Sequence, residues 1–161
     1  MENLRRNVEI EALHGTITMK LSSLGESTPY AADANEPDPR YLGYGARAPE
    51  MRRVISGFKT DFSMLGTEQK VELAERLIGS GYGEQKSVAL ALLEQVPEYF
   101  SPERFDLLEK LIRGLHGWSK IDSFTKFFLK QILDAHEDKF IELPGRVDEL
   151  VSGAACVAFE S

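Results

Sequence analysis

Apolar residues recur at every third or fourth position along most of the chain, which is the spacing that places them on one face of a helix. The first such stretch runs from Glu2 to Leu24 and stops at Gly25, a residue type that often ends helices. The same spacing predicts further helices over residues 49–62, 67–79, 84–96, 101–115, 118–135 and 147–159. No segment alternates apolar and polar residues between hairpin turns, as a half-buried strand would. The pattern therefore predicts an all-α fold with about seven helices.

Helix starts and loops carry their own signals. Pro49 fits the first turn of a helix, and the hydroxyls of Thr67 and Ser101 can cap helix starts. Residues 26–48 hold three prolines, many turn-forming residues and no apolar period. We therefore expect a long loop there, and long loops in compact domains are usually functional or mobile.

The predicted helix over 84–96 is rich in small and branched apolar residues, which is typical of a helix buried on most sides. Five of its positions have similar residues 36 positions later, in the predicted helix over 118–135. The pairs are Val88 and Phe124, Leu92 and Phe128, Leu93 and Leu129, Gln95 and Gln131, and Val96 and Ile132. A period of that order favours stacked helix pairs, as in helical repeat proteins.

The composition is that of one ordinary globular domain. A chain of 161 residues with 42% hydrophobic and 28% charged residues can bury a sizeable core, so we expect a single domain over 1–161. The 19 Lys and Arg against 26 Asp and Glu give a net charge of −7. Because phosphate binding depends on clustered cations, a chain this acidic needs a local basic strip to hold nucleic acid.

The sequence shows no sign of a metal site, a disulfide or a membrane segment. Cys156 is the single cysteine, and His14, His116 and His136 show no metal-ligand spacing with it. We expect no metal and no cofactor. The chain has no export signal and no run near the ~20 apolar residues of a membrane helix, which predicts a cytoplasmic protein without a membrane partner.

Asp122 lies within the apolar arc of the predicted helix over 118–135. A carboxylate on a packing face must find donors or line a cavity, because burying it unpaired is costly. Trp118 lies one turn earlier on the same stripe, so the pair offers an aromatic face and a negative charge to a cationic ligand. Alternatively, the Ser-x-x-Asp arrangement of Ser119 and Asp122 is close to a capping box, in which both would only secure the helix start. The spacing fits both interpretations.

Three segments resemble, in the expected order, motifs of the bacterial DNA alkylation repair family, the alkylpurine DNA glycosylases built from HEAT-like repeats. The segments are YGARAPEMR (44–52), GEQKSVALALL (83–93) and WSKID (118–122). The likeness runs from about Tyr41 to Phe159. This resemblance implies a short right-handed α-solenoid, an ARM-like superhelix of HEAT-like repeats.

The resemblance also implies a DNA repair function. The expected reaction is hydrolysis of the N-glycosidic bond of a cationic alkylated purine, of the 3-methyladenine or 7-methylguanine type, in double-stranded DNA. Asp122 would stabilise the oxocarbenium-like sugar and Trp118 would pack against it, which makes these two the expected catalytic residues. No metal or cofactor is needed, because the cationic base is already a good leaving group.

Cationic side chains in two places are expected to contact the DNA backbone. Arg47, Arg52 and Arg53 lie beside the long loop, and Lys120 and Lys126 lie toward the polar side of the helix that carries Asp122.

The chain departs from the family pattern at two places. Ser119 stands where the family motif has its first Asp, and residues 149–153 lack the paired Arg of the corresponding family segment. The family continues past the position of Ser161 with further helices, so we expect a shortened relative or a fragment. An uncovered apolar face on the helix over 147–159 would then favour self-association. These departures leave an alternative function, a catalytically inactive HEAT-like scaffold that binds protein or, weakly, nucleic acid.

Overall fold

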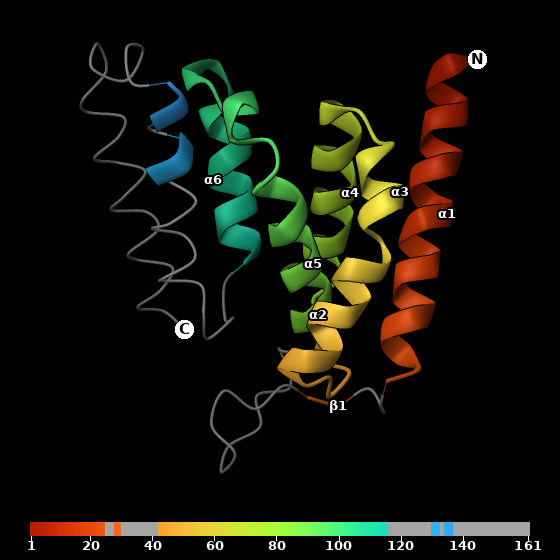
Figure 1. Cartoon of the computed structure of the whole chain (residues 1–161). Helices are drawn as coiled ribbons and strands as arrows, with labels where there is room; N and C mark the ends of the chain where they lie inside the picture. Colours follow the sequence, from red (N-terminus) through yellow and green to blue (C-terminus); the bar gives the residue numbers. More distant parts are fainter. Residues whose placement is uncertain (25–27, 30–41, 116–129, 133, 137–161) are drawn as a thin grey trace. The chain divides into compact units, whose positions relative to one another are not determined.

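The computed structural model describes residues 1–24, 28–29, 42–115, 130–132 and 134–136 (Figure 1). The chain divides into two compact units, residues 1–93 and 94–161. Nearly all the described residues outside the turns are helical, which confirms the predicted all-α class. The HEAT-like solenoid and the single domain over 1–161 stay predictions.

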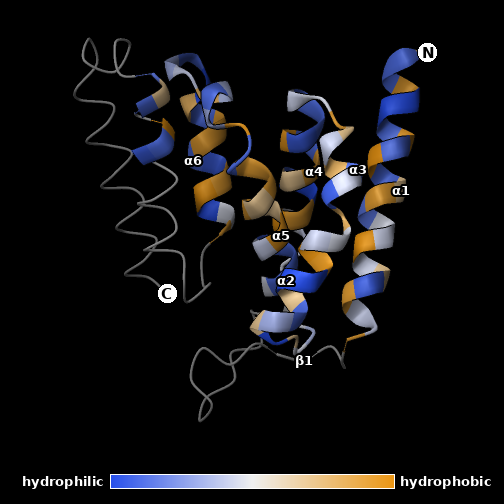
Figure 2. Ribbon diagram, viewed as in Figure 1, coloured by the Kyte–Doolittle hydropathy of each residue, from blue (hydrophilic) through white to orange (hydrophobic). Residues whose placement is uncertain are grey.

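The first unit contains most of the described helices (Figure 1). Its elements are α1 (Glu2–Ser22), β1 (Thr28–Pro29), β2 (Leu42–Gly43), α2 (Ala48–Gly57), α3 (Lys59–Ser63), α4 (Thr67–Gly79) and α5 (Gly83–Leu93). Helices α4 and α5 form a hairpin, and α1 packs against both. As predicted, α5 is buried on most sides, and apolar residues occupy most of its length (Figure 2).

Helix α1 confirms the first predicted helix and supplies part of the core. Ile10, Ile17 and Leu21 are fully buried, whereas the side chains of Leu4 and Val8 are exposed. The buried residues follow the helical period, so one face of α1 packs on α4 and α5 while its first two turns extend into solvent.

The ends of the predicted loop over 26–48 are held together by a short antiparallel pairing. Thr28 pairs with Gly43, and Pro29 pairs with Leu42. The rest of the predicted loop before Leu42 lies outside the described residues. The prediction missed this pairing because two-residue strands are too short to show an alternating pattern.

One predicted helix over 49–62 is divided into α2 and α3. Phe58 joins them, with a backbone (φ −92°, ψ 1°) outside the helical range. Gly57 before it favours this break, because glycine has the most conformational freedom to lose in a helix. The predicted apolar face survives the break, since the rings of Phe58 and Phe62 stack 5.8 Å apart and both are buried.

The predicted cap at Thr67 is wrong. Ser101 does occupy the N-cap position of the 3₁₀ turn over Pro102–Arg104, but without a side-chain capping bond. Gly66 is the N-cap of α4, and its N–H donates to the Gln69 side chain at 2.8 Å. Ser101 makes no capping bond, because its hydroxyl binds the Glu103 carboxylate at 2.6 Å. The Thr67 prediction failed because the Gln69 side chain binds the N–H of Gly66, so the helix start does not need a hydroxyl at its cap.

The second unit begins with two 3₁₀ turns, η1 (Pro97–Tyr99) and η2 (Pro102–Arg104), followed by α6 (Phe105–Gly114). The helix predicted over 84–96 ends earlier, at Leu93, because Pro97 disfavours helical backbone just before it. Residues 130–132 and 134–135 are helical, as expected for the predicted helix over 118–135, and Ile132 is buried. The predicted helix over 147–159 lies outside the described residues.

None of the helices in the described part of the chain combines the length and apolarity needed to cross a bilayer.

Gly81, in the turn between α4 and α5, has φ +82°, a conformation that side chains with a Cβ rarely adopt. Gly81→Ala is therefore expected to lower the free energy of unfolding by about 1 kcal/mol. Gly79→Ala is the matched control, because Gly79 ends α4 and a Cβ there meets no atom within 4 Å. The control should stabilise by about 0.5 kcal/mol, since alanine is the better helix former. Urea unfolding of both variants measures the difference, and equal effects would contradict the prediction.

Candidate nucleic-acid interface

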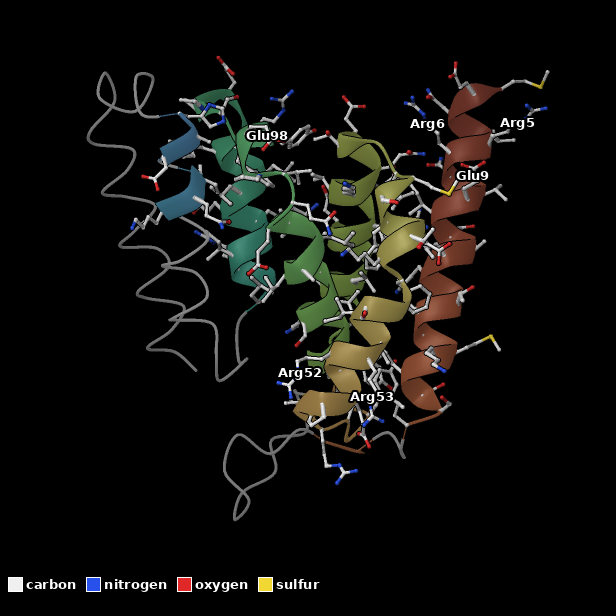
Figure 3. The ribbon with its side chains drawn as sticks, viewed as in Figure 1. Arg5, Arg6, Glu9, Arg52, Arg53 and Glu98 are labelled. Carbon is white, nitrogen blue, oxygen red and sulfur yellow. The ribbon has the colours of Figure 1, made fainter. Side chains whose placement is uncertain are left out.

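The arginine segment, defined as residues 44–53, carries three exposed cations. Arg47 is the N-cap of α2, and Arg52 and Arg53 lie in its second turn. The Arg47 side chain is 81% exposed, and Arg52 and Arg53 are also exposed. Figure 3 shows Arg52 and Arg53 on α2, at the end of the first unit opposite to Arg5 and Arg6. All three arginines that the sequence predicted to bind DNA are therefore exposed, at the start of α2 or on it.

Arg47 makes hydrogen bonds to a residue of the helix that it caps. Its backbone N–H and its guanidinium donate to the two oxygens of Glu50, at 2.8 and 3.1 Å. These hydrogen bonds hold the pKa of Glu50 below its usual value. In the described part of the chain, Arg52 and Arg53 make no ion pair. They are therefore the freer cations for a phosphate.

The turn before α2 is anchored on the start of α5. The N–H groups of Gly45 and Ala46 both donate to Oε1 of Glu84, at 3.1 and 3.2 Å. Gly45 has φ +77°, which allows the backbone to present both donors to one oxygen. The Tyr44 ring stacks on Tyr82, with centroids 4.2 Å apart and planes 7° from parallel.

Gln85 joins this turn to α1. Its amide nitrogen donates to the hydroxyl of Tyr44 at 2.8 Å and to that of Thr18 at 3.3 Å. Its amide oxygen lies 2.9 Å from Nε2 of His14, which is the donor in that bond. Burial raises the pKa of the Tyr44 phenol. The buried side-chain amide of Gln85, on α5, thus binds both α1 and the turn before α2.

The buried polar run at the start of α5 was not among the sequence candidates. Glu84, Gln85 and Lys86 are all buried, and burial lowers the pKa of the Lys86 ammonium group. The one available signal was their position: three polar residues open a helix that was predicted to be buried on most sides.

The other predicted site residues, Trp118, Lys120, Asp122 and Lys126, lie outside the described residues. So does Ser119, on which the capping alternative depends. Within the described part of the chain, no group of His, Cys, Asp and Glu side chains could hold a metal ion.

A comparison with known families adds to this geometry. The model of a family described as DNA alkylation repair enzyme matches residues 39–159, which include the arginine segment, α5 and residues 118–122. The chain belongs to this family. No curated protein and no solved structure matches the chain.

Membership in the DNA alkylation repair family associates the chain with DNA repair and implies that DNA is its partner. The arginine segment, the one predicted group of cations that the structure describes, lies inside the matched region. Helix α1 lies before this region, yet its residues Ile10, Ile17 and Leu21 complete the core on which α5 packs.

Proposed function

We propose that this protein hydrolyses the N-glycosidic bond of cationic alkylated purines in duplex DNA, of the 3-methyladenine or 7-methylguanine type. The observation that carries the proposal is the family match, because it spans both the arginine segment and the WSKID motif at 118–122. The exposure of Arg47, Arg52 and Arg53, at the start of α2 and on it, supports the DNA-holding half of the proposal.

In the proposed reaction the C1′–N bond breaks and its electron pair neutralises the departing base. Positive charge develops on the deoxyribose, and a carboxylate beside the ring stabilises it. Asp122 would supply that carboxylate, and Trp118 would pack against the sugar. A water molecule then adds to C1′ and releases its proton.

DNA binding must rely on local cations because the net charge is −7. We assign the backbone contacts to Arg47, Arg52, Arg53, Lys120 and Lys126. Each phosphate contact contributes about 0.9 to the slope of log K against log salt concentration.

Replacing Arg52 and Arg53 together with alanine is expected to weaken binding to a duplex and lower the salt slope by about 2. Replacing Arg5 and Arg6 together is the matched control, because these two arginines are also exposed but lie at the opposite end of the first unit (Figure 3). Fluorescence anisotropy over about one decade of salt concentration, from roughly 20 to roughly 200 mM, measures both slopes. Equal losses in the two double variants would contradict an interface on α2.

The direct test of the proposed reaction is release of free methylated purine from methylated duplex DNA. Base release by the wild-type protein above a protein-free control supports the glycosylase. The alternative is a noncatalytic HEAT-like scaffold, favoured by the net charge of −7 and by Ser119 in the position of the motif's first Asp. Absence of release, together with absence of duplex binding at low salt, would support the scaffold.

A further inference from the structure

Glu84 makes an unusual set of contacts for a buried carboxylate. Among the described residues, both of its hydrogen bonds come to one oxygen, Oε1, from the consecutive N–H groups of Gly45 and Ala46. The other oxygen, Oε2, is buried and has no hydrogen-bond partner among the described residues. The residue as a whole is 7% exposed.

These contacts are poorly explained by stability alone. A buried carboxylate pays for its lost hydration, and an oxygen without a donor leaves that cost uncompensated. A partly satisfied polar group in a core needs an explanation, and fixing a functional geometry is one such explanation. The geometry that Glu84 fixes is the turn immediately before Arg47.

Three consecutive backbone donors at this turn are each bound by a carboxylate. Gly45 and Ala46 donate to Glu84, and Arg47 donates to Glu50. Glu84 is the one of the two acceptors that lies on a different helix, 38 residues from Ala46. Glu50 secures α2 internally, whereas Glu84 sets where the start of α2 lies on α5.

From these contacts we propose that Glu84 is a positioning residue for the DNA backbone contacts of the arginine segment. The inference rests on the proposed function, because it concerns how that function holds its substrate. Glu84 touches no DNA. It fixes the turn at Gly45 and Ala46, and through the turn it fixes the place from which Arg47, Arg52 and Arg53 reach phosphates.

The experiment compares Glu84→Ala, Glu84→Gln and Val88→Ala in the full chain. Val88→Ala is the control for stability, since Val88 is fully buried in the same helix and has no bond to the turn. Duplex affinity and its salt slope are measured for each variant, and exchange of the Gly45 and Ala46 amide protons is followed by NMR. Glu84→Asp replaces the alanine variant if that variant does not fold, because it withdraws the carboxylate by one methylene.

Glu84→Ala is expected to speed exchange of both amide protons and to lower the salt slope by about 2, as loss of two arginine contacts would. When Arg52→Ala and Arg53→Ala are added to the Glu84→Ala variant, they should reduce duplex affinity much less than the same two substitutions do in the wild-type protein. Glu84→Gln should recover most of the slope, because its amide oxygen can accept both N–H groups. Val88→Ala should leave the slope unchanged.

Three outcomes overturn the inference, and they do so at different levels. If the wild-type protein binds a duplex and Glu84→Ala retains its full salt slope, the positioning role is wrong while the proposed function stands. If the wild-type protein binds no duplex even at low salt, the proposed function fails and the positioning role fails with it. A slope reduced equally by Val88→Ala would also contradict the inference, because general destabilisation would explain it.

Discussion

Exchanging Asp122 for asparagine is expected to slow release of methylated purines from duplex DNA by about 10²- to 10³-fold. Asparagine has nearly the same shape as aspartate but no charge, so it cannot stabilise a developing sugar cation. The rate is measured in a single turnover, with excess protein over methylated duplex and the free base quantified by chromatography.

Ser119→Ala separates the two interpretations of Asp122. If both residues only cap a helix, each substitution should lower the free energy of unfolding by about 1 kcal/mol, and base release should change little. If Asp122 is catalytic, Asp122→Asn should abolish most base release while Ser119→Ala leaves the rate near that of the wild type. Retained release by Asp122→Asn would show that the carboxylate is not catalytic.

The second large effect concerns the core of the first unit. Ile17→Ala is expected to lower the free energy of unfolding by about 3 kcal/mol, because it removes three buried carbons and leaves a cavity between α1 and the helices it packs on. The Ile17 side chain is fully buried, whereas Val8 on the same helix is 60% exposed. Val8→Ala is therefore the matched control, with an expected loss below about 0.5 kcal/mol.

Urea unfolding followed by far-UV circular dichroism reports on this core, because α1 to α5 all lie in the first unit. The result also bears on whether the family region, residues 39–159, can form the first unit without α1. A large loss in Ile17→Ala would mean that residues 39–159 do not form the complete first unit without α1. Similar losses in the two variants would show that α1 does not pack as described.

Helical periodicity alone was sufficient for much of the fold. It predicted the bounds of α1 and α4 closely, because each helix has one apolar face and clear sequence signals at its ends. It failed at Phe58 and Gly66, where local backbone geometry and a neighbouring side chain decide the element boundaries. Such choices depend on small energy differences that a pattern of apolar residues does not contain.

Only the exposed, charged residues of the candidate site could be predicted from the sequence. Arg52 and Arg53 stand out in sequence as adjacent cations beside a loop, and both are exposed in the structure. The contacts of Glu84 and Gln85 could not be predicted, because their partners lie 38 to 71 residues away in the chain. Only the folded arrangement of α1, α2 and α5 brings those groups together.

The 71-residue separation between His14 and Gln85 has a consequence for biosynthesis. At 5 to 20 residues per second, α1 waits on the ribosome for about 4 to 14 seconds before its partner residues in α5 have been made. During that interval α4 and α5, on which α1 packs, have not both been made, although Ile10, Ile17 and Leu21 are fully buried in the finished protein. Until α4 and α5 have both been made, the nascent chain therefore carries this apolar face of α1 without the helices that cover it in the folded protein.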